Sequence, residues 1–278
     1  MSPVLDVPSS RTEPADAQPT RRAGLDLLQL SSRLDEPVGV RGNADSVDMA
    51  VFAFGARGRR LLRAAYLLLD ANMPDAANAL FRVMTEYNIV GRWLAQAGEQ
   101  RMRAWAFNDL RERLTTLREV LTEPKLIGEA RRMIEDEILR SEEALRGYGG
   151  ADIALSKRAA QKAGETTPNL QAMADEVGLG LDFLYSYVYR VLSQADSHAT
   201  MLSIDAVYDV VTGDPGPRLK QMPRHGLPAH DLYGIGARLL ADMLGLVAER
   251  FPELGWDAEL QEIAERLRIE APEHEVSA

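Results

Sequence analysis

The stretch Pro74–Ala97 reads PDAANALFRVMTEYNIVGRWLAQA, and its apolar residues recur at helical spacing on two adjoining sides. Proline suits the first turn of a helix, and a helix that is apolar on two sides is expected near the centre of a bundle. Glu86 falls within this apolar pattern, and Arg82 precedes it by one turn. Because a buried carboxylate is costly unless a partner neutralises it, the pattern predicts a polar pair in a central helix.

This pair has two interpretations, and the sequence leaves both open. An exposed Arg82 and Glu86 at i and i+4 form an ordinary ion pair worth about 0.3–0.5 kcal/mol. A buried pair faces a pocket and contributes to a binding site. The apolar neighbours of Glu86 favour the second interpretation, without excluding the first.

Outward from this stretch, the chain continues as helix after helix, and no segment shows a convincing run of strand alternation. We expect main helices over residues 45–71, 74–97, 99–122, 124–148, 181–198, 228–251 and 256–269, and short ones over residues 24–36, 156–162 and 169–177. Residues 99–122 and 124–148 have charged outer faces, which predicts an antiparallel helical hairpin with one face exposed to solvent. Residues 212–228 are dense in Gly and Pro, which predicts a loop.

The predicted fold is therefore all-α, a single multi-helix bundle of about seven to nine helices. Residues 1–22 read as a disordered tail because they are rich in Pro, Ser and Thr without periodicity. Residues 23–270 form the bundle domain, and residues 271–278 form a frayed C-terminus. Gly55 and Gly58, three residues apart on one helix, indicate a close contact with another helix.

Composition limits the class of protein. The hydrophobic fraction is 46%, enough for a globular core, and the lack of cysteine fits a reducing compartment. The first residues contain no apolar signal-peptide core, so we expect a soluble, cytoplasmic protein. The net charge of −10 disfavours a broad nucleic-acid surface. A local one remains open through the cluster Arg57, Arg59, Arg60 and Arg63.

Sequence motifs for several chemistries are missing. None of the histidines stands three residues after a glutamate, so the signature of a di-metal bundle site is absent. There is also no Walker A sequence, no GxSxG elbow, and no GxGxxG after a strand. The sequence accordingly predicts neither a metal site nor a cofactor.

A second group of polar residues lies on the predicted helix 181–198. Tyr187 and His198 share one side of it, and Ser193 lies beside them. His198, at the helix end, is a candidate general acid or base, or a cap that interacts with the helix dipole. With Arg82, Glu86 and Trp93, these residues make up the candidate ligand site, and His198 and Glu86 are its candidate catalytic residues.

Several short motifs resemble the bacterial domain-of-unknown-function 5677 family (DUF5677). They are Arg82–Glu86 as RxxxE, Trp93-Leu94, Arg103 to Asp109, and Tyr189-Arg190 with Ser193 and His198, within Val51–Asp205. The resemblance implies a helical bundle of unassigned activity, in which Arg82, Glu86, Ser193 and His198 converge. The chain departs from the family in its proline-rich N-terminal tail and in a longer Pro/Gly-rich loop after His198.

Three functions follow as hypotheses. The first is a helical-bundle protein with a buried polar pocket for a small ligand. The second is a HEPN-like, metal-independent ribonuclease or phage-defence-type effector, although Arg190 and His198 are spaced too widely for the HEPN motif. The third is a non-catalytic protein-interaction module. Bundles of this kind often form homodimers, but no segment of the sequence identifies an interface.

Overall fold

The computed structural model describes residues 17–35, 46–147, 167–178, 208–211, 218–221 and 229–269. Its contacts divide the chain into two compact units. Unit 1 comprises Met1–Val40, Val51–Asn88 and Gly180–Ala278, and unit 2 comprises Arg41–Ala50 and Ile89–Leu179. The structure confirms the all-α class, and each unit is described by itself.

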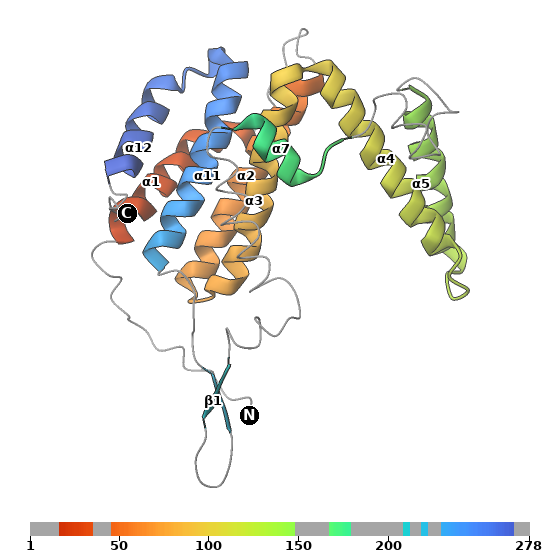
Figure 1. The fold of residues 1–278 in the computed structure, drawn as a ribbon, viewed down its shortest axis with the longest axis horizontal. Helices are drawn as coiled ribbons and strands as arrows, with labels where there is room; N and C mark the ends of the chain where they lie inside the picture. The colour runs from red at the N-terminus through yellow and green to blue at the C-terminus, as the bar shows by residue number, and fades with distance from the viewer. Residues whose placement is uncertain are drawn as a thin grey trace. The chain divides into compact units, whose positions relative to one another are not determined.

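Unit 1 is a bundle of helices that lie side by side (Figure 1). Its elements are α1 (Ala17–Leu30), the short 3-10 helix η1 (Ser31–Asp35), most of α2 (Ser46–Asp70), the first part of α3 (Pro74–Ala97), α11 (Ala229–Arg250), the 3-10 helix η3 (Pro252–Leu254) and α12 (Asp257–Ile269). Helix α11 packs against both α1 and α12, which also contact each other.

The centre of unit 1 is α11. Its side chains Leu232, Leu240, Leu244 and Val247 are all 0% exposed, and burying each such side chain contributes about 1.5–3 kcal/mol. The sequence predicts the central position for α3, which does bury a broad side that includes Phe81 and Met84. Helix α11 is contacted from more directions, because α1, α2, α3 and α12 all pack on it.

Glycines let helices approach α11 closely. A β-carbon on Gly55 of α2 would lie 2.7 Å from Val247 Cγ2, and one on Gly58 would lie 2.6 Å from Met243 Cε. Real β-carbons essentially never come this close to another heavy atom. The close helix contact that the spacing of Gly55 and Gly58 predicts is therefore confirmed.

Unit 2 contains α4 (Glu99–Leu121), α5 (Gly128–Gly147) and α7 (Leu170–Val177). Helices α4 and α5 form the predicted antiparallel hairpin (Figure 1), around a small core of Phe107, Leu114 and Leu145. Two ion pairs cross between these helices, Arg113–Glu137 and Arg118–Glu142. Helix α7 begins at the predicted place, where the Ala172 N–H donates to Asn169 Oδ1 at 2.9 Å.

Several boundaries differ from those expected. Helix α1 begins at Ala17, before the expected Gly24, and α5 begins at Gly128, after the expected Pro124. Tyr208–Val211 and Arg218–Gln221 form two antiparallel strands, β1 and β2. The loop that we expected over residues 212–228 therefore includes β2. Four-residue strands are too short for alternation to be detected, which explains the difference. The helices expected over 156–162 and 181–198 lie outside the described residues.

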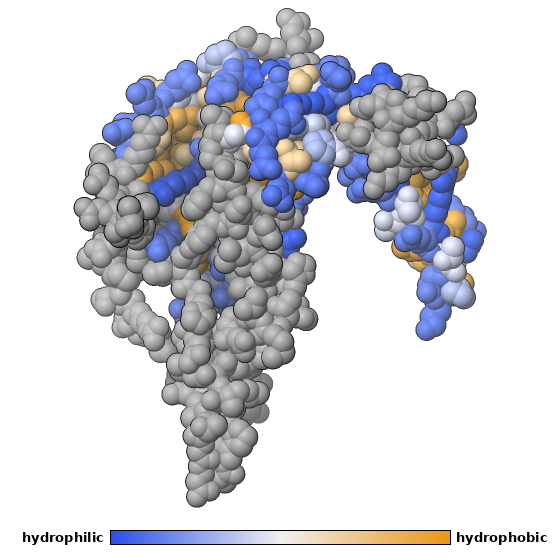
Figure 2. Space-filling view, in the orientation of Figure 1, coloured by the Kyte–Doolittle hydropathy of each residue, from blue (hydrophilic) through white to orange (hydrophobic). Residues whose placement is uncertain are grey.

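Hydrophilic residues cover much of the described surface in the view of Figure 2, with hydrophobic residues between the helices. A few large hydrophobic side chains are exposed, among them Leu67, Ile127, Met133 and Leu139. In the described part of the chain, no helix combines the length and the apolar character that crossing a membrane requires.

Candidate functional site

The structure corrects the predicted environment of Glu86. Its side chain is exposed, and Arg82, one turn earlier on α3, is half-buried. No ion pair joins the two residues within the described part of the chain. The prediction that Glu86 lies buried in the apolar wall is wrong, because a carboxylate is stabilised by water and α3 turns this residue outward.

The polar residues that α3 does bury are uncharged. Thr85 is 0% and Asn88 is 1% exposed. The Thr85 hydroxyl donates to the Phe81 carbonyl at 2.9 Å, and Asn88 Nδ2 donates to the Leu239 carbonyl of α11 at 2.8 Å. An amide that forms such a bond is far less costly to bury than a carboxylate. Asn88, and not Glu86, is therefore the buried polar residue through which α3 contacts α11.

Trp93, a predicted ligand contact, lies in unit 2 and is 4% exposed. Its indole N–H donates to Glu176 Oε2 of α7 at 2.8 Å. The Arg101 guanidinium lies 4.8 Å from the Trp93 ring centroid and forms an ion pair with Glu176. These contacts hold α7 against α3 and α4. A ligand could use the Trp93 N–H only by displacing Glu176.

Three predicted site residues, Tyr187, Ser193 and His198, lie outside the described residues. Their predicted convergence on Arg82 and Glu86 thus stays a prediction. Within the described part of the chain, no group of three or more His, Asp or Glu side chains is arranged to hold a metal ion.

Sequence reasoning missed a polar cluster that joins α1, α2 and α11. Arg21 forms a salt bridge with Asp70 at 2.9 Å. The Tyr233 hydroxyl donates to the same carboxylate at 2.5 Å, and the Tyr66 hydroxyl donates to the Tyr233 carbonyl at 3.0 Å. Asp70 and Tyr233 are 163 positions apart in the sequence, so no local spacing could reveal this cluster.

The side chains of this cluster pack closely against one another and against α1. The Tyr66 and Tyr233 rings meet edge to face with centroids 4.9 Å apart. Gly24 of α1 lies directly over Tyr66, since a β-carbon there would lie 1.8 Å from the Tyr66 hydroxyl oxygen. Burial raises the pKa of Tyr66 well above its usual range. Burial and the hydrogen bond to Asp70 do the same for the pKa of Tyr233.

These raised pKa values predict a loss of stability in alkali. Each of these phenols ionises at about pH 10 in the unfolded chain and at a higher pH in the folded protein. The difference adds to the free energy of unfolding, and below about pH 10 this contribution is fully present. That contribution is lost as the pH rises further, because only the unfolded chain then releases its protons. We expect the melting temperature to fall above about pH 10, and to fall less steeply in Tyr66→Phe.

Thermal melts between neutral and alkaline pH test this prediction, with Tyr87→Phe as the control. Tyr87 is half-buried and stacks on Phe54 at 5.1 Å. An unchanged pH dependence in Tyr66→Phe would assign the alkaline loss to other groups.

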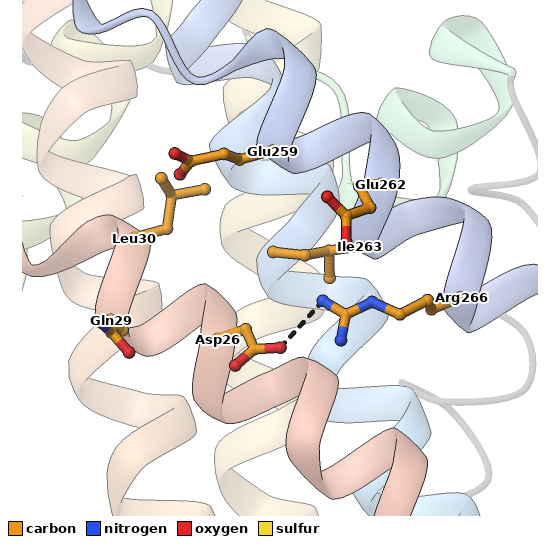
Figure 3. A pocket seen from close by; sticks show the side chains of 7 residues that line it. All are labelled: Asp26, Gln29, Leu30, Glu259, Glu262, Ile263 and Arg266. Atoms are coloured by element: carbon orange, nitrogen blue, oxygen red, sulfur yellow. Dashed lines mark ion pairs between the residues drawn. The ribbon is translucent and has the colours of Figure 1, made fainter.

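A small cavity lies between α1 and α12, with a volume of about 210 Å³. Figure 3 shows Leu30 and Ile263 in its wall, and Asp26 and Arg266 pointing toward each other from the two helices. The two side chains form an ion pair at 2.9 Å. Glu259 and Glu262 are exposed. Because Arg266 neutralises Asp26, the cavity is a hollow beside a surface ion pair that ties α12 to α1.

Comparison with known proteins gives one family. The model of the family of unknown function DUF5677 matches residues 48–215. No curated protein and no solved structure shows significant similarity to the chain. The match spans α2 to β1 and includes the RxxxE motif at Arg82–Glu86 as well as Ser193 and His198. The chain therefore belongs to the DUF5677 family, a family of unknown function.

Proposed function

We propose that this protein binds a small polar ligand at a partly exposed site on α3. Arg82 and Glu86 form the described part of the site, and Tyr187, Ser193 and His198 supply the rest. The observation that supports the proposal is the environment of Glu86. It is exposed and forms no hydrogen bond or ion pair with any described residue, although Thr85, Asn88 and Ile89 nearby on the same helix are buried.

The chemistry of these side chains defines the class of ligand. An ionised carboxylate only accepts hydrogen bonds, and a guanidinium only donates them. Glu86 therefore suits an amine or amide N–H, and Arg82 suits a carboxylate, phosphate or carbonyl oxygen. A ligand that carries both groups, such as an amino-acid-like or nucleotide-like molecule, matches the pair. Ser193 and His198 can donate or accept, and they would orient the polar remainder of the ligand.

Glu86→Gln tests the site. Because Glu86 is exposed, the substitution should leave the melting temperature of the free protein nearly unchanged. A screen of small polar metabolites by thermal shift should find a ligand that raises the melting temperature of the wild type. At about one hundred times its dissociation constant, the rise should be about 5–10 °C. In Glu86→Gln most of that shift should be lost.

Glu119→Gln, which removes an exposed carboxylate on α4, is the matched control and should keep the full ligand shift. Equal shifts in Glu86→Gln and the wild type would contradict a role for Glu86. His198→Ala then separates the alternatives. Loss of RNA cleavage at unchanged stability would favour the metal-independent ribonuclease. A screen without any ligand would favour the protein-interaction module.

The proposal includes a cytoplasmic location. The chain contains no cysteine, which fits a protein that folds in a reducing compartment.

A further inference from the structure

The exposed side of α5 carries acidic and basic residues in a regular order. Helix α5 packs on α4 through its inner side, where Leu145 is 2% exposed (Figure 1). On the opposite side, residues three or four positions apart lie above one another and form one stripe along the helix. This stripe, called the α5 stripe below, consists of Glu129, Arg132, Asp136, Leu139, Glu143 and Arg146. All of them are exposed, and Leu139 is exposed to 62%.

Two charges of the α5 stripe are available to a second molecule. The side chains of Arg132 and Glu143 form no ion pair or hydrogen bond with any described residue. They stand 11 positions apart in the sequence, which is about 17 Å along a helix, so they cannot pair with each other in one chain. Arg146, in contrast, lies 3.7 Å from the Glu142 carboxylate. Arg132 and Glu143 are therefore the charges on which the following argument depends most.

We propose that a second copy of this chain packs on the α5 stripe, with the two α5 helices antiparallel. The order of charges supports this arrangement. When Arg132 of one copy faces Glu143 of the other, Glu129 faces Arg146, and two-fold symmetry repeats both contacts. A parallel pair would instead set each charge against the same charge of the other copy, which is repulsive. The stripe is thus complementary to itself in the antiparallel direction.

Leu139 supplies the apolar centre of this contact. In the same register Leu139 comes level with Asp136 of the other copy, and the two Leu139 side chains are offset by about 4.5 Å along the helix axis. They can therefore contact each other, and pairing removes both from water. Arg140, which follows Leu139, brings a guanidinium to the same level as Asp136 of the other copy.

The composition of α5 argues against other occupants of the stripe. Helix α5 contains six acidic and four basic residues, whereas a nucleic-acid strand or an anionic membrane is bound by a surplus of basic residues. A helix in a membrane interface also needs a continuous apolar side. The large apolar residues exposed on α5, Met133 and Leu139, are separated by charged ones. A second copy gains from both signs of charge. The proposal goes beyond the ligand site, because it involves neither Arg82 nor Glu86.

Sedimentation velocity of the full chain over a range of concentrations tests the proposal. The mass of the wild type should rise with concentration toward twice that of one chain. Arg132→Glu sets acidic residues against each other at both symmetric contacts, and Glu143→Arg does the same with basic residues. Each should raise the dissociation constant of the dimer at least about tenfold. The double variant R132E/E143R restores opposite charges and should dimerise within about threefold of the wild type. Because the two positions cannot meet within one chain, this recovery requires contact between two copies.

Glu119→Arg is the control, because it makes the same reversal at an exposed residue of α4, and it should dimerise like the wild type. At concentrations where the wild type is monomeric, all these variants should keep its melting temperature, since the altered side chains are exposed. If a reversal unfolds the chain, Arg132→Gln and Glu143→Gln should each weaken the dimer by about threefold. A wild type that stays monomeric, or a double variant as weak as the single ones, would overturn the proposal. So would binding to phosphatidylserine vesicles without formation of a dimer.

Discussion

Gly236→Ala should destabilise the protein by about 1–3 kcal/mol, the cost of adding atoms to a packed core. A β-carbon at Gly236 would lie 2.5 Å from Phe81 Cε1 and 2.6 Å from Leu62 Cδ1. Both neighbours are 0% exposed, so neither can move into solvent to make room. The loss should appear as a lower midpoint in urea unfolding, at an unchanged dependence on denaturant.

Gly245→Ala is the matched control, because it makes the same change in the same helix. A β-carbon there meets no heavy atom within 4 Å, and alanine favours a helix over glycine by about 1 kcal/mol. We therefore expect Gly245→Ala to raise the unfolding midpoint. Equal effects at the two positions would show that helix propensity, and not the contact with Phe81 and Leu62, governs Gly236.

Removal of the chain after residue 228 should abolish cooperative folding of unit 1. The truncated protein would lack α11 and α12, and the apolar sides of α1, α2 and α3 would lose the surface on which they pack. Total stabilities of domains are only about 5–15 kcal/mol, and Leu232, Leu240, Leu244 and Val247 of α11 together contribute a comparable amount. Thermal melts followed by circular dichroism should show no sigmoidal transition for this unit.

A chain that ends at Glu270 keeps α12, and it should melt like the full protein. A sharp transition in the shorter protein, ending at residue 228, would show that α11 is dispensable. This prediction also concerns the family, since the matched residues 48–215 end before α11 begins. A fragment limited to those residues lacks the central helix of unit 1.

The helices and their order could be predicted because each depends on local periodicity. Pro74–Ala97, Glu99–Leu121 and Leu170–Val177 were predicted nearly to the residue, since a proline, glycines and an asparagine cap mark their ends. Helix boundaries without such signals differ from the predicted ones, as at the start of α1 at Ala17. The strands β1 and β2 escaped prediction because pairing between two short segments is not a local property.

The candidate site was predictable only in part, and Glu86 shows why. Helical spacing places Glu86 near an apolar side of α3. Successive residues of a helix, however, are rotated by only about 100° around its axis. The partner helix decides which of them is buried. In the structure that partner is α11, and it contacts Asn88 through the Leu239 carbonyl. The polar cluster of Arg21, Tyr66, Asp70 and Tyr233 likewise has no local signature.

The sequence by itself determined the all-α class, the main helices and the family, because helix periodicity, end signals and short motifs are properties of neighbouring residues. The tertiary structure alone decided which helix is central, which polar side chains are buried and which arginines face solvent. Those outcomes depend on contacts between segments far apart in the chain. Burial selects the uncharged Thr85 and Asn88 for the interior and leaves Glu86 in water, where a charged group is most stable.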